Sequence, residues 1–332
     1  MTFNTSIVQL PVSHINLKDN RFQITTSTDL SRLSDSIKNT GLISLPLIYA
    51  EINAGKKPDF IIVSGFRRIK ACQYLGMKNI EIRIAGSDTA QIDLVRFAIT
   101  ENAFQRPLNL IEKSRAYSML SRFFPDNKKH ENMLEKEALN LGLSDASHMI
   151  KKLLPLCHMP ESVQKGLAED SISLPAALEL NTLKPEYADI LACLFTDLKL
   201  STSKQREVMN LLKDISLCHE ISIKDILDEK NLCEILQNQD IDRNQKSHAL
   251  RTILKQRRYP AIVQAEKNYE KYLKELKLGQ NIKLVPPKDF EGSVYSLILN
   301  FSNVNELKEQ SKILERIIQE PSLDKILEKQ LI

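Results

Sequence analysis

The feature that most constrains how this chain can fold is a change of sequence character at Pro107. Before it, short apolar runs rich in β-branched residues alternate with segments whose apolar residues recur every three or four positions, as in strands and helices. After it, from Leu108 to about Leu278, one helical pattern follows another with almost no strand signal. The sequence therefore predicts an α/β region followed by an all-helical one.

A second change of character comes near residue 279. Ile282–Pro287 and Ser293–Ser302 have the composition of strands, and Val304–Gln319 has the spacing of an amphipathic helix. We therefore expect an α+β, mostly helical fold in three parts. These are an α/β domain over residues 1–107, an all-α domain over residues 108–278 and a small ββα piece over residues 279–332.

The first part shows a regular order of elements, each bounded by turn or capping residues. The expected elements are a strand over Val8–Ile15, a helix over Asp29–Thr40 capped by Ser27 or Thr28 and ended by Gly41, a hairpin of Leu45–Glu51 and Asp59–Ser64 around the turn Asn53–Pro58, a helix over Arg67–Leu75, a strand over Ile80–Ile84 and a helix from Ser87 to Asn102. Strands and helices thus alternate as in a small layered α/β domain.

Composition narrows the class of protein. With 42% hydrophobic and 27% charged residues, the chain has the balance of a globular protein. A net charge of only +4 means that nucleic-acid binding has to be argued from local patches. The five cysteines include no CxxC pair, which favours reduced core thiols over zinc or disulfides. Without a secretory signal or a run of about 18 apolar residues, we expect a cytoplasmic protein that makes no membrane contact.

A strand-to-helix junction, VSGFRRIKACQYLG (Val63–Gly76), is the first motif that suggests a ligand. Free backbone N–H groups at a helix N-terminus attract anions, and Gly65 would let a phosphate approach the backbone. Arg67 and Arg68 add forked donors that match phosphate oxygens. A tight turn with two solvated arginines explains the same residues, so the motif alone leaves both readings open.

A polar stretch, ENAFQRPLNLIEKSRAY (Glu101–Tyr117), is the second motif. Glu101 and Asn102 supply oxygen ligands of the kind that Mg²⁺ accepts when it also holds phosphates. Arg106 can reach the same anion, and Asn109 with Glu112 has the spacing of a helix capping box. The alternative is a polar interdomain turn.

Residues 132–153 have the pattern of a helix-turn-helix. An amphipathic helix over Asn132–Leu141 is followed by Gly142, which allows a tight turn, and by Ser144, which can cap the second helix. Such a unit places the N-terminal residues of its second helix in the major groove of DNA. The residues expected to contact DNA are Ser144, Ser147, His148, Lys151 and Lys152. An ordinary helical hairpin is the alternative.

These motifs, in this order, resemble the ParB family, whose N-terminal domain carries G-E-R-R-x-R-A and later E-N-x-Q-R-x-x-L-N-x-x-E. The matching segments are GFRRIKA (Gly65–Ala71), ENAFQRPLNLIE (Glu101–Glu112), SIKNTGLISLPLIY (Ser36–Tyr49) and, for the helix-turn-helix, Ser144–Leu180. The resemblance covers residues 8–182 and implies a nucleotide-pocket domain followed by a DNA-binding domain.

The resemblance also implies CTP and Mg²⁺ as cofactors. Carried over, Gly65, Arg67 and Arg68 would hold the triphosphate, Glu101 and Asn102 would serve the metal and hydrolysis, and Arg21 and Arg106 would lie near the nucleotide. The sequence departs from the family at Phe66, which replaces an acid, at Lys70, and by one inserted residue before Gln105. Nucleotide binding is therefore expected, and hydrolysis is expected to be weak at most.

Two further segments concern assembly and charge. Between Asp240 and Lys283, eleven basic residues stand against five acidic ones, a surplus that suits either phosphate contact or a solvated helix face. The ββα piece is too small to be stable alone, so we expect Ile282–Ile332 to dimerise the chain. The helix face expected to be buried there consists of Leu307, Ile313, Leu314 and Ile317.

The motifs and the family resemblance together predict a site-specific DNA-binding protein of chromosome or plasmid partition that works as a CTP-dependent clamp in the nucleoid. Its implied partners are double-stranded DNA, a second copy of the chain and a ParA-like ATPase. The alternatives are a ParB-like transcription regulator or nucleoid-associated factor without nucleotide turnover, and a sulfiredoxin-like phosphotransferase. The last is disfavoured because Ser64 and Gly65 stand where sulfiredoxin has a cysteine.

Overall fold

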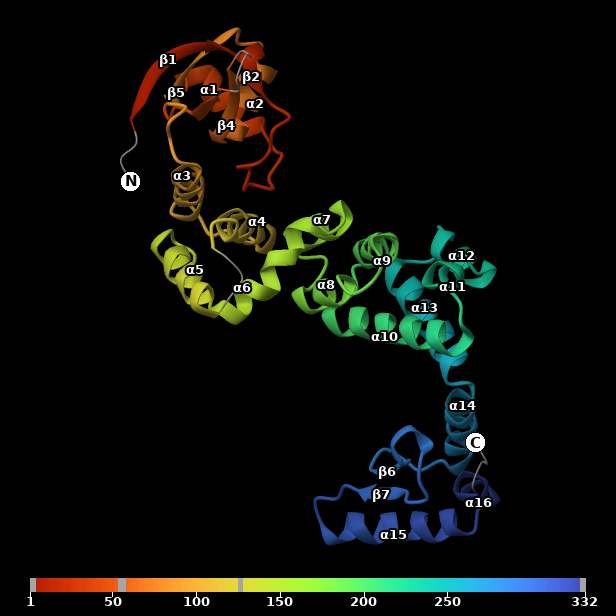
Figure 1. The fold of residues 1–332 in the computed structure, drawn as a ribbon. Coiled ribbons are helices and arrows are strands. Elements are labelled where there is room, and N and C mark those ends of the chain that lie inside the picture. Colours follow the sequence, from red (N-terminus) through yellow and green to blue (C-terminus); the bar gives the residue numbers. More distant parts are fainter. Residues whose placement is uncertain (1–3, 53–57, 125–127, 329–332) are drawn as a thin grey trace. The chain divides into compact units, whose positions relative to one another are not determined.

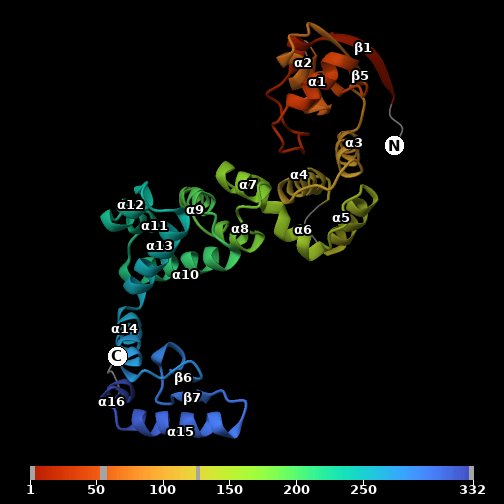
Figure 2. The same ribbon diagram turned by 180° about the vertical axis from the view of Figure 1, so that it is seen from behind.

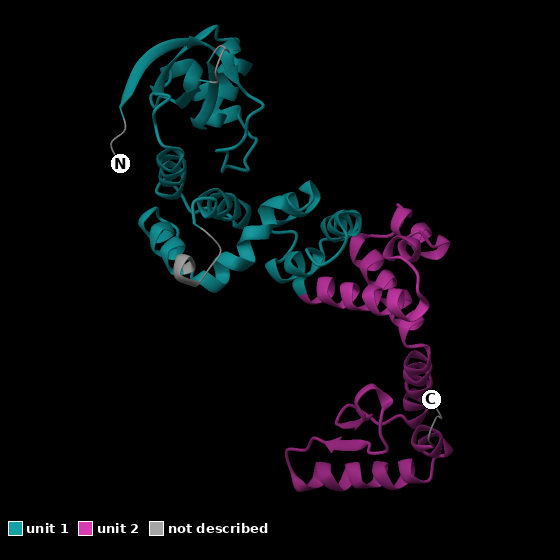
Figure 3. Ribbon diagram, in the orientation of Figure 1, with its two compact units in different colours: residues 1–202 teal, residues 203–332 magenta. Residues whose placement is uncertain are grey.

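The structure, a computed structural model, describes residues 4–52, 58–124 and 128–328, and only the backbone of 128–131 (Figure 1). The chain divides into two compact units, residues 1–202 and 203–332, and each is described by itself (Figure 3). The first unit therefore contains the α/β region together with the first helices of the helical region. The division into three domains stays a prediction.

Unit 1 opens with a five-stranded mixed sheet in the order β1-β5-β3-β4-β2. The strands are β1 (Thr5–Pro11), β2 (Ile15–Asn16), β3 (Leu47–Glu51), β4 (Asp59–Ser64) and β5 (Asn79–Ala85). Strands β3 and β4 pair antiparallel as predicted, and most of their expected turn lies outside the described residues. The single strand predicted over Val8–Ile15 is instead β1 and β2, separated by a 3₁₀ turn that follows Pro11, a residue without an N–H for the ladder.

Three helices complete the α/β region: α1 (Ser31–Thr40), α2 (Phe66–Tyr74) and α3 (Gln91–Ala103). Figures 1 and 2 show α1 and α2 against the sheet, and α3 packs on β4. The core between these layers is apolar and fully buried, with Leu47, Ile48, Ile61 and Ile62 among its members. The predicted cap of α1 by Ser27 or Thr28 is wrong, because the Asp29 carboxylate accepts from the Ser31 backbone N–H.

The predicted helical region is confirmed, since the described part of residues 108–278 contains no strand. In unit 1 its helices are α4 (Leu110–Ser121), α5 (Lys128–Asn140), α6 (Ser147–Leu153), α7 (Glu161–Ala168), α8 (Leu174–Leu180) and α9 (Pro185–Leu198). From the unit boundary onward they are α10 (Thr202–His219), α11 (Ile223–Leu227), α12 (Lys230–Gln237), α13 (Arg243–Arg258) and α14 (Pro260–Leu276).

Unit 2 ends in the predicted ββα arrangement. Strands β6 (Ile282–Val285) and β7 (Ser296–Leu299) pair antiparallel and lie along α15 (Val304–Ile318), while a further helix, α16 (Pro321–Leu327), packs on α14 (Figures 1 and 2). Ile317 is buried in this core and Ile313 packs partly against it. Leu307 was expected to be buried but is 38% exposed in the single chain.

The cysteines are all free, as expected. Cys72 is buried in the core as predicted. Cys193 and Cys218 are exposed, so the prediction that they lie in the core is wrong.

Candidate functional site

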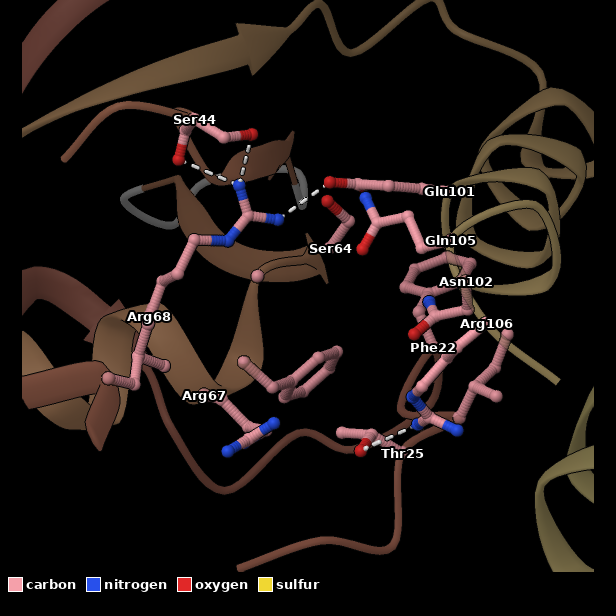
Figure 4. A pocket seen from close by; sticks show the side chains of 14 residues that line it. Phe22, Thr25, Ser44, Ser64, Arg67, Arg68, Glu101, Asn102, Gln105 and Arg106 are labelled. Carbon is pink, nitrogen blue, oxygen red and sulfur yellow. Dashed lines mark hydrogen bonds and ion pairs between the residues drawn. The ribbon is translucent and has the colours of Figure 1, made fainter. Parts of the chain in front are cut away.

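A pocket in unit 1 brings together most of the residues predicted to bind a nucleotide (Figure 4). Its volume of about 310 Å³ suits a small ligand. Its lining consists of Phe22, Ile24, Thr25, Leu33, Ser44, Ser64, Gly65, Phe66, Arg67, Arg68, Glu101, Asn102, Gln105 and Arg106. Three arginines and one glutamate give this lining a surplus of positive charge, which favours an anionic ligand.

The floor of the pocket is the junction between β4 and α2. Gly65 is the N-cap of α2 and adopts a left-handed conformation with φ of 88°. A Cβ atom at this position would lie 2.9 Å from the Cβ of Pro46, so both backbone and space require glycine here. The junction thus leaves the first N–H groups of α2 without a side-chain cap, as an anion seat requires.

The two arginines of this junction have different partners. Arg67 donates from Nη2 to the Asp29 carbonyl at 2.5 Å, and its buried Nε has no hydrogen-bond partner among the described residues. Arg68 donates from Nη1 to the Ser44 hydroxyl and from Nη2 to Oε1 of Glu101, at 2.7 and 2.6 Å. Arg68 is thereby fixed between two sides of the pocket.

The end of α3 supplies the two residues predicted to hold a metal. Oε1 of Glu101 is committed to Arg68, whereas its Oε2 is buried without a hydrogen-bond partner in the described part of the chain. The Asn102 side-chain amide donates back to the Ala98 carbonyl at 2.8 Å. An unpaired buried carboxylate oxygen fits a hard cation that also binds phosphate.

Arg106 forms the opposite wall and is tied to a buried glutamate. Its Nη1 and Nη2 donate to Glu112 at 2.6 and 2.7 Å, and Glu112 also accepts from the backbone N–H groups of Thr26 and Asn109. Burial raises the pKa of Glu112, but the hydrogen bonds from Arg106 and these N–H groups outweigh it and leave the pKa below its usual value. The predicted capping box of Asn109 and Glu112 is confirmed, and it also anchors the pocket loop at Thr26.

Arg21 was predicted to lie near the nucleotide, but it is not among the described residues that line this pocket. Its guanidinium instead pairs with Asp19 and Glu51, at 2.7 and 2.8 Å. Residues that the sequence did not single out do line the pocket: Phe22, Ile24 and Leu33 give it an apolar side, together with the buried Phe66.

The predicted helix-turn-helix corresponds to α5 and α6, which pack with α4. Helix α6 begins at Ser147, and its N-cap residue Ala146 makes no side-chain cap. The predicted cap by Ser144 is therefore wrong, because the turn is longer than expected and the Glu135 carboxylate of α5 binds the Ser147 N–H and hydroxyl instead. Ser144 is exposed.

The turn before α6 is fixed to α4 through Asp145. Its carboxylate pairs with Lys113 at 2.9 Å and accepts a hydrogen bond from the buried Tyr117 hydroxyl at 2.7 Å. Burial, with this carboxylate, raises the pKa of Tyr117. Three predicted DNA contacts, His148, Lys151 and Lys152, are exposed on α6.

Several cations of the basic stretch of residues 240–283, all on α13, form ion pairs within unit 2. Arg251 pairs with Glu207 at 2.7 Å, Lys255 with Glu266 at 2.6 Å, and Arg257 with Glu229. These contacts favour a structural role for the cations of α13 over a dedicated phosphate-binding face.

The fold and pocket define a class: an α/β domain with an arginine-lined pocket, continued by helices. Residues 2–103 match the model of the ParB N-terminal domain. This match identifies residues 2–103 as a ParB N-terminal domain.

Curated relatives agree with this assignment. The probable chromosome-partitioning protein ParB of Rickettsia bellii is 31% identical over 180 residues, 54% of this chain and 56% of the relative. The nucleoid occlusion protein of Halalkalibacterium halodurans is 29% identical over 181 residues, 54% of this chain and 58% of the relative. The chain therefore spans little more than half the length of the relatives that it matches.

Solved structures include the C-terminally truncated ParB of Caulobacter crescentus in two complexes. The complex with CTP-γ-S covers 57% of this chain and 98% of that one, at 19% identity and a TM-score of 0.26. The complex with the centromeric parS site covers 60% and 96%, at 19% identity and a TM-score of 0.31. Within the described residues, no helix is both long and apolar enough to cross a bilayer.

Proposed function

We propose that this protein is a site-specific DNA-binding protein of the chromosome- or plasmid-partition type, whose N-terminal domain is a switch operated by CTP and Mg²⁺. The observation that carries the proposal is the pocket itself. It gathers Gly65, Arg67, Arg68, Glu101 and Arg106 from two segments, residues 65–68 and 101–106, and it leaves the buried Nε of Arg67 and Oε2 of Glu101 without partners in the described chain. Such atoms suit phosphate and its cation.

The pocket divides the expected ligand between two environments. The arginines and the uncapped start of α2 would bind the triphosphate, while Phe22, Ile24, Leu33 and Phe66 offer an apolar side for the base and ribose. Cytosine is proposed from the ParB resemblance, because no contact described here reads a base edge. Glu101 and Asn102 would hold the Mg²⁺.

Labelled CTP and ATP, mixed with the purified protein with and without DNA, test this function directly. The proposal expects Mg²⁺-dependent retention of CTP in preference to ATP, increased by a cognate DNA site. Absence of heat in calorimetry at millimolar CTP, with Mg²⁺ and DNA present, would refute the nucleotide switch.

DNA binding would use α6, with His148, Lys151 and Lys152 toward the duplex. A second copy of the chain would close the clamp, joined through residues 282–332, where Val294, Ile298 and Leu307 expose apolar surface. We also propose, from the ParB resemblance, a ParA-like ATPase as partner and residence at the nucleoid in the cytoplasm.

A ParB-like regulator or nucleoid-associated factor without turnover is the second candidate. Phe66 favours it, because this buried pocket residue replaces the acid of the family motif. The relative named as a nucleoid occlusion protein is consistent with it. A malachite-green phosphate assay with cognate DNA separates the two: CTP binding without phosphate release identifies the non-hydrolysing form.

A further inference from the structure

Ser64 is a buried pocket residue to which no role has been assigned. It is the last residue of β4, it directly precedes Gly65, and its side chain lines the pocket while the residue is only 2% exposed. Within the described chain, its hydroxyl has no hydrogen-bond partner. Burying a hydroxyl without a partner is costly, so a group that enters the pocket is the natural partner for it.

A second unpaired oxygen lies on the same side of the pocket. Glu101 uses Oε1 to bind Arg68, and its buried Oε2 has no partner among the residues described. Helix α3, which carries Glu101, packs on β4, which carries Ser64, and Figure 4 shows the Ser64 hydroxyl beside the end of the Glu101 side chain in this view. Each of these two pocket side chains therefore carries a buried oxygen that can accept a further partner.

The chemistry of this pair fits a divalent cation. Mg²⁺ accepts a carboxylate and a hydroxyl and fills its remaining positions with phosphate oxygens and water. No group of three or more acidic, His or Cys side chains in the described residues could hold a metal alone, so the cation would arrive with the phosphates.

We propose that Ser64 is a ligand of the cation that accompanies a bound nucleoside triphosphate, acting together with Glu101. The inference rests on the proposed nucleotide function and adds a metal ligand to it. The competing explanation is purely structural: the hydroxyl would merely donate to Glu101 after a small rotation. The two differ in one measurable respect, which is whether the effect of Ser64 depends on the metal.

Calorimetry of the full chain with CTP, in Mg²⁺ and in EDTA, measures this dependence. We define the metal gain as the ratio of the two Kd values. Even outer-sphere metal partners change affinity by about 10–100-fold, so Ser64→Ala should reduce the metal gain by about tenfold or more and leave the Kd in EDTA unchanged. Ser64→Thr, which keeps the hydroxyl, should retain the gain.

The chain provides a matched control in Ser34. It is likewise a buried serine, 4% exposed, whose hydroxyl has no partner in the described part of the chain, but it does not line the pocket. Ser34→Ala should leave both Kd values unchanged. An equal loss by Ser64→Ala in Mg²⁺ and in EDTA would overturn the proposal, because it would show a phosphate contact or a structural role.

A thiol at the same position gives an independent test. Ser64→Cys should lose the gain with Mg²⁺ and recover it with Cd²⁺, because sulfur prefers soft metals, while Ser34→Cys should behave as wild type with either ion. Failure of Cd²⁺ to restore the gain would contradict direct coordination. If the wild-type chain binds no CTP with any cation, the proposed function itself fails, an outcome distinct from CTP binding that is indifferent to Ser64.

Discussion

Replacing Glu112 should free the pocket loop from α4. The Glu112 side chain is 1% exposed and accepts two bonds from Arg106, two from the N–H and hydroxyl of Thr26, and one from the Asn109 N–H. Hydrogen bonds to a charged group contribute about 1.5–3 kcal/mol each, but Arg106 is 42% exposed and its pair is screened. We therefore expect Glu112→Ala to lower the free energy of local opening by about 3 kcal/mol.

Hydrogen exchange followed by mass spectrometry measures this local free energy. A change of about 3 kcal/mol corresponds to exchange about 150-fold faster at the Thr26 amide, which Glu112 protects in the wild type. Glu51→Ala is the control, because Glu51 also pairs with an arginine but lies outside this network. An unchanged Thr26 exchange rate in Glu112→Ala would show that Glu112 does not hold the loop.

The stabilisation that Glu112 gives to the pocket loop should decrease at acidic pH. Because the pKa of Glu112 is lowered in the folded chain, its stabilisation is present above the unfolded value of about 4.3 and is lost as the pH falls through the folded value. Thr26 protection in the wild type should therefore decline on acidification below about pH 4.3, whereas Glu112→Ala should show no such step.

Three further predictions concern ligands and assembly. Arg67→Ala removes charge-assisted bonds and should weaken CTP binding by about ten- to a hundredfold in calorimetry; unchanged affinity would take Arg67 off the phosphates. Lys151→Ala with Lys152→Ala should reduce the salt slope of DNA binding by about 2, roughly equally for all sequences; an unchanged slope in fluorescence anisotropy would remove α6 from the DNA. A chain ending at Leu278 should sediment as a monomer without nucleotide, and a dimer would place the interface elsewhere.

The order of elements could be predicted from the sequence because the signals are local. Periodicity and Gly41 placed the body and end of α1, and the spacing of Asn109 and Glu112 predicted the start of α4 correctly. The caps of α1 and α6 were mispredicted because other side chains bind the N–H groups at the starts of these helices. Glu135, twelve residues before Ser147, binds the start of α6 in place of Ser144.

The pocket was only partly predictable, since its residues come together over long sequence distances. Glycine and arginine at a strand-to-helix junction carry a local signal, but the apolar side formed by Phe22, Ile24 and Leu33 carries none. Arg21 is an arginine in a segment that resembles the family, as Arg68 is, and the sequence does not distinguish the two. Only the fold shows that the partner of Arg21 is Glu51, thirty residues away. Ser64 could be recognised only once its hydroxyl proved to be buried and unpaired.

The ion pairs of α13 change what a salt titration measures. Ion pairs join Arg251 to Glu207, Lys255 to Glu266 and Arg257 to Glu229. Added salt weakens such partly exposed pairs, as it weakens phosphate contacts. A curve of DNA affinity against ionic strength would therefore combine loss of phosphate contacts with loosening of unit 2. Thermal unfolding of unit 2 alone across the same salt range measures how much salt destabilises this unit. After correction for that effect, the slope of DNA affinity against salt gives the number of phosphate contacts.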